Sequence, residues 1–248
     1  MIVASNISKS FSGEKVLDRI STVFEQGKTN LIIGQSGSGK TVFMKCCIGL
    51  LDPDEGEVRF DDRNFSAMGE YKKRHIRKEM GVLFQGGALF DSFNVEQNVM
   101  FPLNMFTTMS QEEKLERVNF SLKRVNLENV NRLMPAELSG GMLKRVAIAR
   151  AIANNPKYLF CDEPNSGLDP KTAEVIDALI SEITEDFNMT TVVNTHDMNS
   201  VLQIGQKISY LYNGQLWWEG DKTSILETEN EELRDFVFST ELTRRLKI

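Results

Sequence analysis

The chain has 248 residues, of which 41% are hydrophobic and 26% are charged, and its formal net charge is -6. This composition excludes a disordered or fibrous chain, and the length suffices for one large α/β domain with its own core. The acidic balance argues against a nucleic-acid partner, because binding to phosphate backbones depends on clustered Lys and Arg. One short basic cluster, at residues 72–78, is interpreted as a solvated helix face.

The sequence offers no membrane-spanning or secretory segment. Its apolar runs, such as residues 31–33, fall far short of the roughly 20 residues that a membrane-spanning helix requires. The N-terminus lacks a basic segment followed by an apolar one, so we expect the chain to stay in the cytoplasm. Cys46, Cys47 and Cys161 show no metal-type spacing, and we expect three buried, reduced thiols.

In chain order, the pattern predicts short strands at residues 2–7 and 16–24 and a buried strand at 29–33, which runs into a glycine-rich loop and a helix. Further apolar runs are typical of buried parallel strands, and they lie at residues 81–84, 158–161 and 190–193. Because ligands of such sheets bind at the carboxyl ends of the strands, we expect the functional residues there.

Residues 94–156 have a helical pattern without a convincing strand, and we expect them to form an inserted helical subdomain. The catalytic core is then expected at residues 1–93 and 157–230. The last segment, residues 231–248, has apolar residues at a spacing that places several of them on one face of a helix. Two interpretations of this tail stay open: packing on its own domain, or gripping a second chain or an accessory subunit.

A phosphate-binding loop follows the third predicted strand and opens the first predicted helix. Every fixed position of that motif is filled by Gly34, Gln35, Ser36, Gly37, Ser38, Gly39, Lys40 and Thr41. The glycines let backbone amides converge on phosphate oxygens, Lys40 supplies a positive charge, and the Thr41 hydroxyl can ligate Mg²⁺. The loop therefore predicts a nucleotide such as ATP, with Mg²⁺, as the ligand.

Two acidic residues, Asp162 and Glu163, end the apolar run at residues 158–161. In a protein with a phosphate loop, Asp162 is expected to hold the Mg²⁺ through water, and Glu163 to polarise the attacking water as general base. An acidic pair alone would equally be a helix N-cap. The phosphate loop favours the catalytic interpretation.

A second anion-binding element begins an Ala-rich helix, where Ser139, Gly140 and Gly141 follow one another. A capped helix start explains Ser139 but not two glycines in the first turn, which cost about 1 kcal/mol each. The chain has no internal repeat and already has one phosphate loop, so the second element is redundant within it. We infer that it serves the nucleotide of a neighbouring chain.

With these motifs in order, the sequence resembles the ABC ATPase family over essentially its whole length. The resemblance implies an α/β fold of the P-loop NTPase, ABC type: a mixed-sheet core with an antiparallel β subdomain and an inserted α-helical subdomain. It also implies ATP and Mg²⁺ as ligands, a head-to-tail homodimer, and transmembrane permease subunits as partners. The chain would then lie at the cytoplasmic face of the inner membrane.

The same resemblance assigns roles to four more residues. Gln85 falls in the Q-loop, which touches Mg²⁺ and the attacking water, and His196 is the histidine at the γ-phosphate. Asp169 ends the D-loop, residues 166–169, and is expected near the nucleotide. Phe11 falls where an aromatic ring stacks on adenine, with a core aromatic as the alternative.

A shorter resemblance, within residues 81–103 and at Met142, is to the ATPase of bacterial phospholipid-trafficking (MCE-associated, maintenance of lipid asymmetry) systems. It implies MCE-type and accessory subunits as further partners. The alternatives are an ABC ATPase of another membrane complex, of the exporter or cell-division type, or a soluble ABC switch protein. A simpler interpretation of the aromatic residues in this segment is that they form the core of the subdomain.

Overall fold

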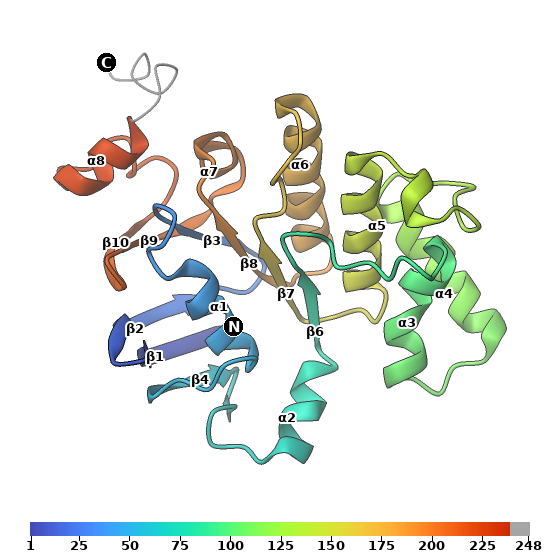
Figure 1. Cartoon of the computed structure of the whole chain (residues 1–248), viewed down its shortest axis with the longest axis horizontal. Coiled ribbons are helices and arrows are strands. Elements are labelled where there is room, and N and C mark those ends of the chain that lie inside the picture. Colours follow the sequence, from blue (N-terminus) through green and yellow to red (C-terminus); the bar gives the residue numbers. More distant parts are fainter. Residues whose placement is uncertain (239–248) are drawn as a thin grey trace.

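The computed structural model describes residues 1–238 and contains two β-sheets surrounded by helices (Figure 1). The larger sheet has the strand order β10-β9-β3-β8-β7-β6, and β10 alone runs antiparallel to its neighbour. Its strands are β3 (Thr29–Ile33), β6 (Met80–Leu83), β7 (Tyr158–Asp162), β8 (Thr190–Thr195), β9 (Lys207–Tyr212) and β10 (Gln215–Gly220). The smaller sheet is antiparallel, with the order β2-β1-β4-β5, and comprises β1 (Ile2–Phe11), β2 (Glu14–Phe24), β4 (Glu55–Phe60) and β5 (Arg63–Asn64).

Eight α-helices cover these sheets within the described residues. They are α1 (Lys40–Ile48), α2 (Glu70–Arg77), α3 (Val95–Phe106), α4 (Gln111–Arg124), α5 (Gly140–Ile152), α6 (Pro170–Asp186), α7 (Met198–Ile204) and α8 (Glu231–Val237). Helices α3, α4 and α5 contact one another and lie beyond β6, at the right of Figure 1. Their starts are well defined, because Asn94 and Ser110 cap α3 and α4 in capping boxes.

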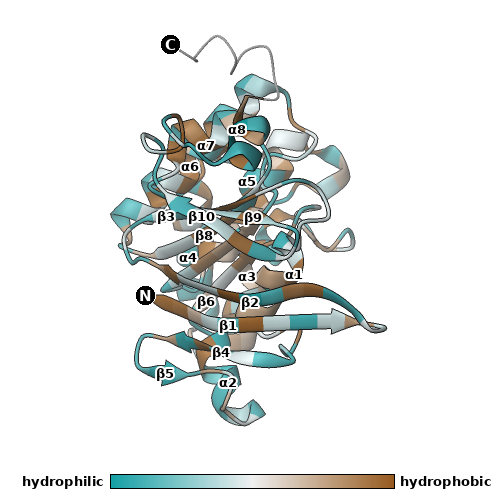
Figure 2. Cartoon of the chain, turned by 90° about the vertical axis from the view of Figure 1, so that its left-hand side faces the viewer, coloured by the Kyte–Doolittle hydropathy of each residue, from teal (hydrophilic) through white to brown (hydrophobic). Residues whose placement is uncertain are grey.

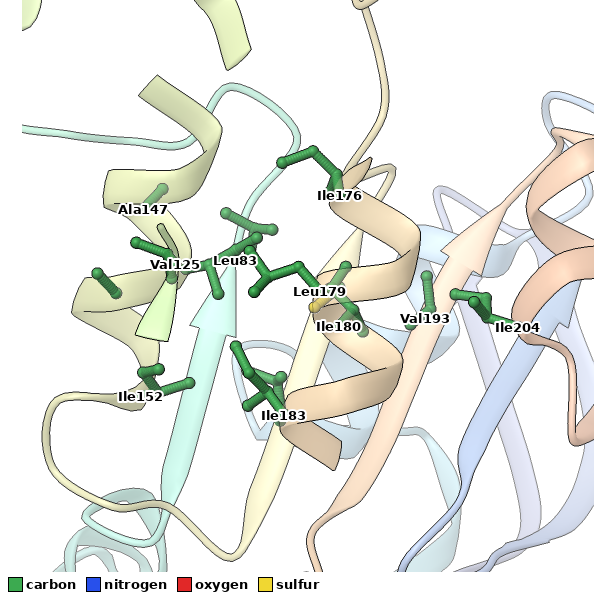
Figure 3. Close-up of a cluster of buried hydrophobic side chains, with 14 of the residues drawn as sticks. Leu83, Val125, Ala147, Ile152, Ile176, Leu179, Ile180, Ile183, Val193 and Ile204 are labelled. Carbon is green, nitrogen blue, oxygen red and sulfur yellow. The ribbon is translucent and has the colours of Figure 1, made fainter. Parts of the chain in front are cut away.

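The hydrophobic core has two parts. In the first, Leu179, Ile180 and Ile183 of α6 pack beside Leu83 and Val193 of the large sheet, as Figure 3 shows. In the second, α1 fills the space between the two sheets and contacts strands of both. Figure 2 shows brown apolar residues alternating with paler ones along β1 and β2, as expected for strands with one buried face.

The buried strands predicted from apolar runs are present: β3 has the predicted bounds, β6 is shifted by one residue, and β7 and β8 extend one and two residues further. Four strands were not predicted: β4, β5, β9 and β10. The hairpin between β9 and β10 turns at Asn213 and Gly214, both with positive φ. Asn-Gly is a strong signal for a two-residue hairpin turn, so this pair was predictable from the sequence.

The C-terminal segment packs on its own domain where the structure describes it. Helix α8 buries Leu233, Phe236 and Val237 in the first core cluster. The two remaining apolar residues of the predicted helical face, Leu242 and Leu246, lie outside the described residues. The described part of the tail therefore favours the first of its two interpretations.

Three smaller predictions can also be compared with the structure. Cys46, Cys47 and Cys161 are free and buried, as expected. The basic cluster lies on α2, where most side chains are exposed but Lys73 and Ile76 are buried. Within residues 1–238 no helix has the length and apolar character needed to cross a bilayer.

Candidate nucleotide-binding site

The phosphate loop starts where the fully buried strand β3 ends. Gly34 has a φ of +150°, and a Cβ atom there would lie 2.3 Å from the backbone oxygen of Leu211. Gly39, with a φ of +99°, forms the N-cap of α1. A side chain is therefore excluded at Gly34 by contact and disfavoured at Gly39 by conformation. The result is a backbone loop at a helix N-terminus, which is a ready site for anions.

Lys40 folds back over this loop. Its ammonium donates hydrogen bonds to the carbonyl oxygens of Gly34 at 2.8 Å and Gln35 at 3.0 Å, and the residue is 7% exposed. Burial lowers the pKa of Lys40, while the charges of Glu163 and Asp162 oppose that shift. The hydrogen-bond partners of Lys40 in the described structure are neutral carbonyls, so its positive charge remains available to an anion.

Asp162 lies at the carboxyl end of β7, facing the phosphate loop. Its Oδ1 atom accepts hydrogen bonds from Thr41 Oγ1 at 3.2 Å and from Asn194 Nδ2 at 3.0 Å. Asn194 is fully buried on β8 and is the register partner of Asp162. Sequence reasoning missed Asn194, although a polar residue near the end of a buried strand marks this edge of the sheet.

Glu163 and His196 form a hydrogen-bonded pair. The Nδ1 atom of His196 lies 2.9 Å from Oε1 of Glu163. Glu163 has a φ of +48°, and its backbone N–H donates to the carbonyl oxygen of Asn194 at 3.0 Å. A left-handed conformation at a bulky residue is strained, and such strain is typical of functional sites. The pair is accessible, because the His196 side chain is 65% exposed.

Gln85 follows β6, and its Nε2 atom donates to Ser166 Oγ at 3.4 Å. This contact joins the predicted Q-loop to the predicted D-loop. Ser166 itself comes three residues after Glu163, so the amide of Gln85 lies beside the acidic pair.

Helix α5 holds the Q-loop from the other side. Lys144 donates a hydrogen bond to the backbone oxygen of Gln85, and Arg150 donates to the oxygens of Gly87 at 2.7 Å and Ala88 at 2.8 Å. Both cations were missed from the sequence, where they look like ordinary helix residues. Through them, the helix that begins with Ser139 is tied to Gln85.

A cavity of about 270 Å³ brings residues of the phosphate loop together with Gln85, Glu163 and His196. Its lining consists of Val16, Ser36, Gly37, Gly39, Lys40, Thr41, Val42, Gln85, Glu163 and His196. Ser38 Oγ, in the same loop, is buried without a hydrogen-bond partner. An open glycine-rich cradle, a buried ammonium and an unsatisfied hydroxyl fit a nucleotide phosphate group.

The residues present also fit Mg²⁺. Thr41 Oγ1, Gln85 and Asp162 supply oxygen ligands near the cavity, and no cluster of three His, Cys, Asp or Glu side chains suited to a metal occurs among residues 1–238. Mg²⁺ usually keeps several waters and binds through one or two carboxylates plus phosphate oxygens, so a dedicated protein cage is not needed.

Some predicted residues lie outside this cavity. Phe11 ends β1, is 42% exposed, and has the ammonium of Lys9 at 5.6 Å from its ring centroid. Asp169 is the N-cap of α6, where the hydroxyl and backbone amide of Thr172 donate to its carboxylate and lower its pKa. In the single chain, Asp169 therefore acts as a helix cap.

Ser139, Gly140 and Gly141 also lie outside the cavity, at the start of α5. Ser139 Oγ accepts a hydrogen bond from the amide of Met142 at 3.3 Å. Gly141 has a packing reason that the sequence did not reveal, because a Cβ there would lie 2.7 Å from Cγ2 of Thr172. Gly140 has no such neighbour closer than 3.5 Å and is exposed, so its missing side chain leaves backbone open on the surface.

A phosphate loop between a buried strand and a helix, with an acidic pair at the end of a nearby parallel strand, defines a P-loop nucleoside triphosphatase. Residues 17–166 match the ABC transporter family, and the chain belongs to it. The predicted fold class is confirmed, and the chain is an ATP-binding subunit that hydrolyses ATP.

Two groups of relatives have similar identity to this chain. The methionine import ATP-binding protein MetN of Campylobacter jejuni is 36% identical over 253 residues, covering 96% of this chain and 75% of MetN. The intermembrane phospholipid transport system ATP-binding protein MlaF of Escherichia coli K12 is 38% identical over 222 residues, covering 90% of this chain and 82% of MlaF.

Among solved structures, the dimeric structure of MJ0796, a bacterial ABC transporter cassette, is 35% identical with a TM-score of 0.82. It covers 90% of this chain and 99% of MJ0796. A dimeric post-hydrolysis state of the same cassette, bound to ADP and Pi, is 34% identical with a TM-score of 0.81, with the same coverage.

Proposed function

We propose that two copies of this chain pair head to tail and bind ATP between them, and that the cycle of pairing and hydrolysis drives a membrane permease. The observation that carries the proposal is that the two predicted anion-binding elements do not line the same cavity. The phosphate loop lines the nucleotide cavity, whereas Ser139 and Gly140 are exposed at the N-terminus of α5. A second copy can bring its α5 to the phosphate loop of the first.

Within each site, the side chains have distinct roles. Lys40 binds the β- and γ-phosphates, and Thr41, Gln85 and Asp162 would hold Mg²⁺, which neutralises charge on the phosphates when bound. Glu163 takes the proton of the attacking water, and His196 orients Glu163 through their 2.9 Å contact while facing the γ-phosphate. Phe11 presents its exposed ring to adenine.

A separate groove is proposed as the docking site for the permease. This cavity, of about 520 Å³, is mainly apolar and is lined by the end of α1, the Q-loop and α3. Its apolar residues include Ile48, Leu50, Phe84, Phe90, Phe101 and Phe106. Leu50 is 57% exposed and Phe90 is 40% exposed, so these two are surface residues rather than subdomain core. An apolar helix of a permease would bury them.

The groove and the nucleotide site share the Q-loop. Arg150 lines the groove and holds the backbone at Gly87 and Ala88, two to three residues from Gln85. Movement of a permease helix in the groove would therefore reach Gln85 through a short, hydrogen-bonded segment. On this view the chain lies at the cytoplasmic face of the membrane because its permease holds it there.

For the transported substrate, we propose phospholipid moved between bacterial membranes, in a complex with MCE-type and accessory subunits. Support comes from residues 81–103 and from two MlaF relatives, of Escherichia coli and of Haemophilus influenzae, the latter 34% identical over 96% of this chain. Methionine import is the second candidate, supported by the 36% identity to MetN. Purifying the chain with its membrane subunits and identifying the bound ligand by mass spectrometry separates the two, because bound phospholipid favours the first and a methionine-binding subunit the second.

The catalytic assignment is tested with Glu163→Gln. The variant should bind ATP but turn over on the order of 10²–10⁴ times more slowly, which is the usual contribution of a positioned general base. It should also accumulate as an ATP-bound dimer in size-exclusion chromatography. Glu174→Gln is a matched control, since Glu174 is exposed on α6. Steady-state hydrolysis near the wild-type rate would remove Glu163 from the role of base.

A further inference from the structure

Asp177 is a buried acid that the ATPase mechanism does not use. It lies on α6, which packs against α7, and it is 2% exposed. Asn165 and Ser200 face its carboxyl group as hydrogen-bond donors, yet its Oδ1 atom has no partner. Asn165 Nδ2 in turn donates to Ser200 Oγ at 3.1 Å.

Among residues 1–238, no cation forms an ion pair with this carboxyl group. The charged or titratable group that acts on it is Asp197, the N-cap of α7, and Asp177 in turn acts on the buried thiol of Cys161 on β7. Burial raises the pKa of Asp177 to about 6. A buried, unpaired carboxylate costs stability, so a hydrophobic residue would serve a purely structural purpose better.

The three side chains join segments that carry the reacting groups. Asn165 lies between Glu163 and Ser166, and Ser166 accepts the hydrogen bond from Gln85. Ser200, which is 1% exposed, lies in the first turn of α7, four residues after His196. The Asn165–Ser200 hydrogen bond joins the β7–α6 connection to the first turn of α7, and both side chains act on the buried carboxyl group of Asp177.

We propose that Asp177 is a positioning residue for ATP hydrolysis. Through Asn165 and Ser200 it fixes the position of the segment that begins with Glu163 relative to the segment that begins with His196. The aligned Glu163–His196 pair depends on that relation, because each of the two residues begins one of these segments. The proposal rests on the roles assigned above to Glu163 and His196.

The charge state of Asp177 makes this relation dependent on pH. As a carboxylate it accepts from both Asn165 and Ser200, whereas protonation below about pH 6 removes part of its acceptor capacity. Protonation of Asp177 should then lower the turnover number as the pH falls. This decrease adds to the pH dependence that ATP hydrolysis has for other reasons. Asp197, the nearby acid, disfavours ionisation of Asp177, and Cys161 is kept as a neutral thiol by burial.

The test compares ATP hydrolysis by the full-length wild type, Asp177→Asn, Ser200→Ala and the double variant. At pH 7.5 the Asp177→Asn variant should lose about tenfold in kcat with KM for ATP within about twofold, because misplacement affects chemistry more than binding. The ratio of wild-type to variant kcat should approach one at pH 5, where the wild-type carboxyl is protonated. Ser200→Ala should lose a similar factor, and the double variant should lose little more.

A matched control lies on the same helix. Thr184 is also buried on α6 and makes hydrogen bonds within the core, so Thr184→Val should leave kcat unchanged. Thermal melts establish that each variant is folded. Three results would overturn the proposal: a wild-type kcat for Asp177→Asn at pH 7.5, a ratio that does not change between pH 7.5 and 5, or fully additive losses in the double variant. The role of Glu163 as general base is tested separately with Glu163→Gln, so failure of one proposal can be told apart from failure of the other.

Discussion

The position proposed for Asp177 carries an energetic cost, and the size of that cost depends on pH. Its pKa is raised from 3.8 to about 6 in the folded chain by burial. The neutral carboxyl is therefore favoured in the folded state, and its stabilising contribution is complete below the unfolded pKa. It is lost as the pH rises through the folded pKa, so the window of change runs from about pH 4 to pH 6.

We therefore expect Asp177→Asn to be more stable than the wild type at pH 8 but not at pH 4. The gain at pH 8 should reach at most about 3 kcal/mol, since each pKa unit corresponds to about 1.4 kcal/mol. Urea unfolding at the two pH values measures it. A variant that is equally stabilised at both values would mean that the benefit comes from packing or hydrogen bonding and not from removal of a buried charge.

The individual site residues differ in how far the sequence reveals them. The phosphate loop was predictable because its chemistry is contiguous: residues 34–41 form the whole cradle. Asn194 and Lys144 were not, because each acts on a residue far away in sequence, Asp162 and Gln85 respectively. Such contacts depend on which strands and helices become neighbours, and a single sequence does not contain that information.

Gly141 illustrates a different limit. In the sequence both glycines of α5 are interpreted as anion-binding, but a Cβ at Gly141 would lie 2.7 Å from the methyl group of Thr172, which would have to move. Only Gly140 remains without a packing reason. A functional interpretation of a glycine is thus strongest where neither its φ nor its neighbours explain it.

Two hairpins show how local turn chemistry fixes these sheets. The turn between β9 and β10 contains Gly214, with a φ of +73°, and the turn between β1 and β2 contains Gly13, with a φ of +87°. A Cβ at Gly214 would lie 2.3 Å from the backbone oxygen of Val16, whereas nothing lies within 4 Å of one at Gly13. The two positions share a conformation and differ in crowding.

Replacing each glycine by alanine should therefore separate the cost of backbone strain from the cost of a steric clash. Gly13→Ala is expected to cost about 1 kcal/mol of unfolding free energy, for the left-handed conformation alone. Gly214→Ala should cost a further 1–3 kcal/mol or so, because the backbone must move to admit the methyl group. Denaturant titrations compare them, and equal losses would show that the contact with Val16 relaxes without cost.

The secondary structure was predictable where a clear hydrophobic pattern marks the element in the sequence. The fully buried strands β3, β7 and β8 were predicted as continuous apolar runs, and capping signals mark α3 and α4. Strands β4 and β10 were missed because they mix exposed and buried residues without a long apolar run. β4 is positioned by pairing with β1, which is distant in sequence. β10 is positioned by pairing with β9 across a short hairpin turn.

Under the proposed head-to-tail pairing, the parts of one catalytic site lie on two separate surfaces of the chain. If a complete site combines the phosphate loop of one copy with the α5 N-terminus of the other, two chains damaged at different surfaces can rescue each other. Lys40→Ala removes the charge of the loop. Gly140→Asp places a negative charge at the second element, and the structure accommodates it because Gly140 is exposed with no heavy atom closer than 3.5 Å to its Cβ position.

Each variant alone should be inactive, because both sites of its homodimer are damaged. In an equimolar mixture, half of the dimers are mixed, and each mixed dimer has one intact site and one doubly damaged site. Hydrolysis should therefore recover to about a quarter of the wild-type rate if the two sites work independently, and to less if they must work together. As a reference, the active variant Gly13→Ala is mixed with Lys40→Ala. The rate of this mixture shows how far an inactive chain lowers the hydrolysis of an active one. An equimolar mixture that stays as inactive as its components, while still forming dimers with ATP, would exclude shared sites that work independently, because one such site is complete in the mixed dimer.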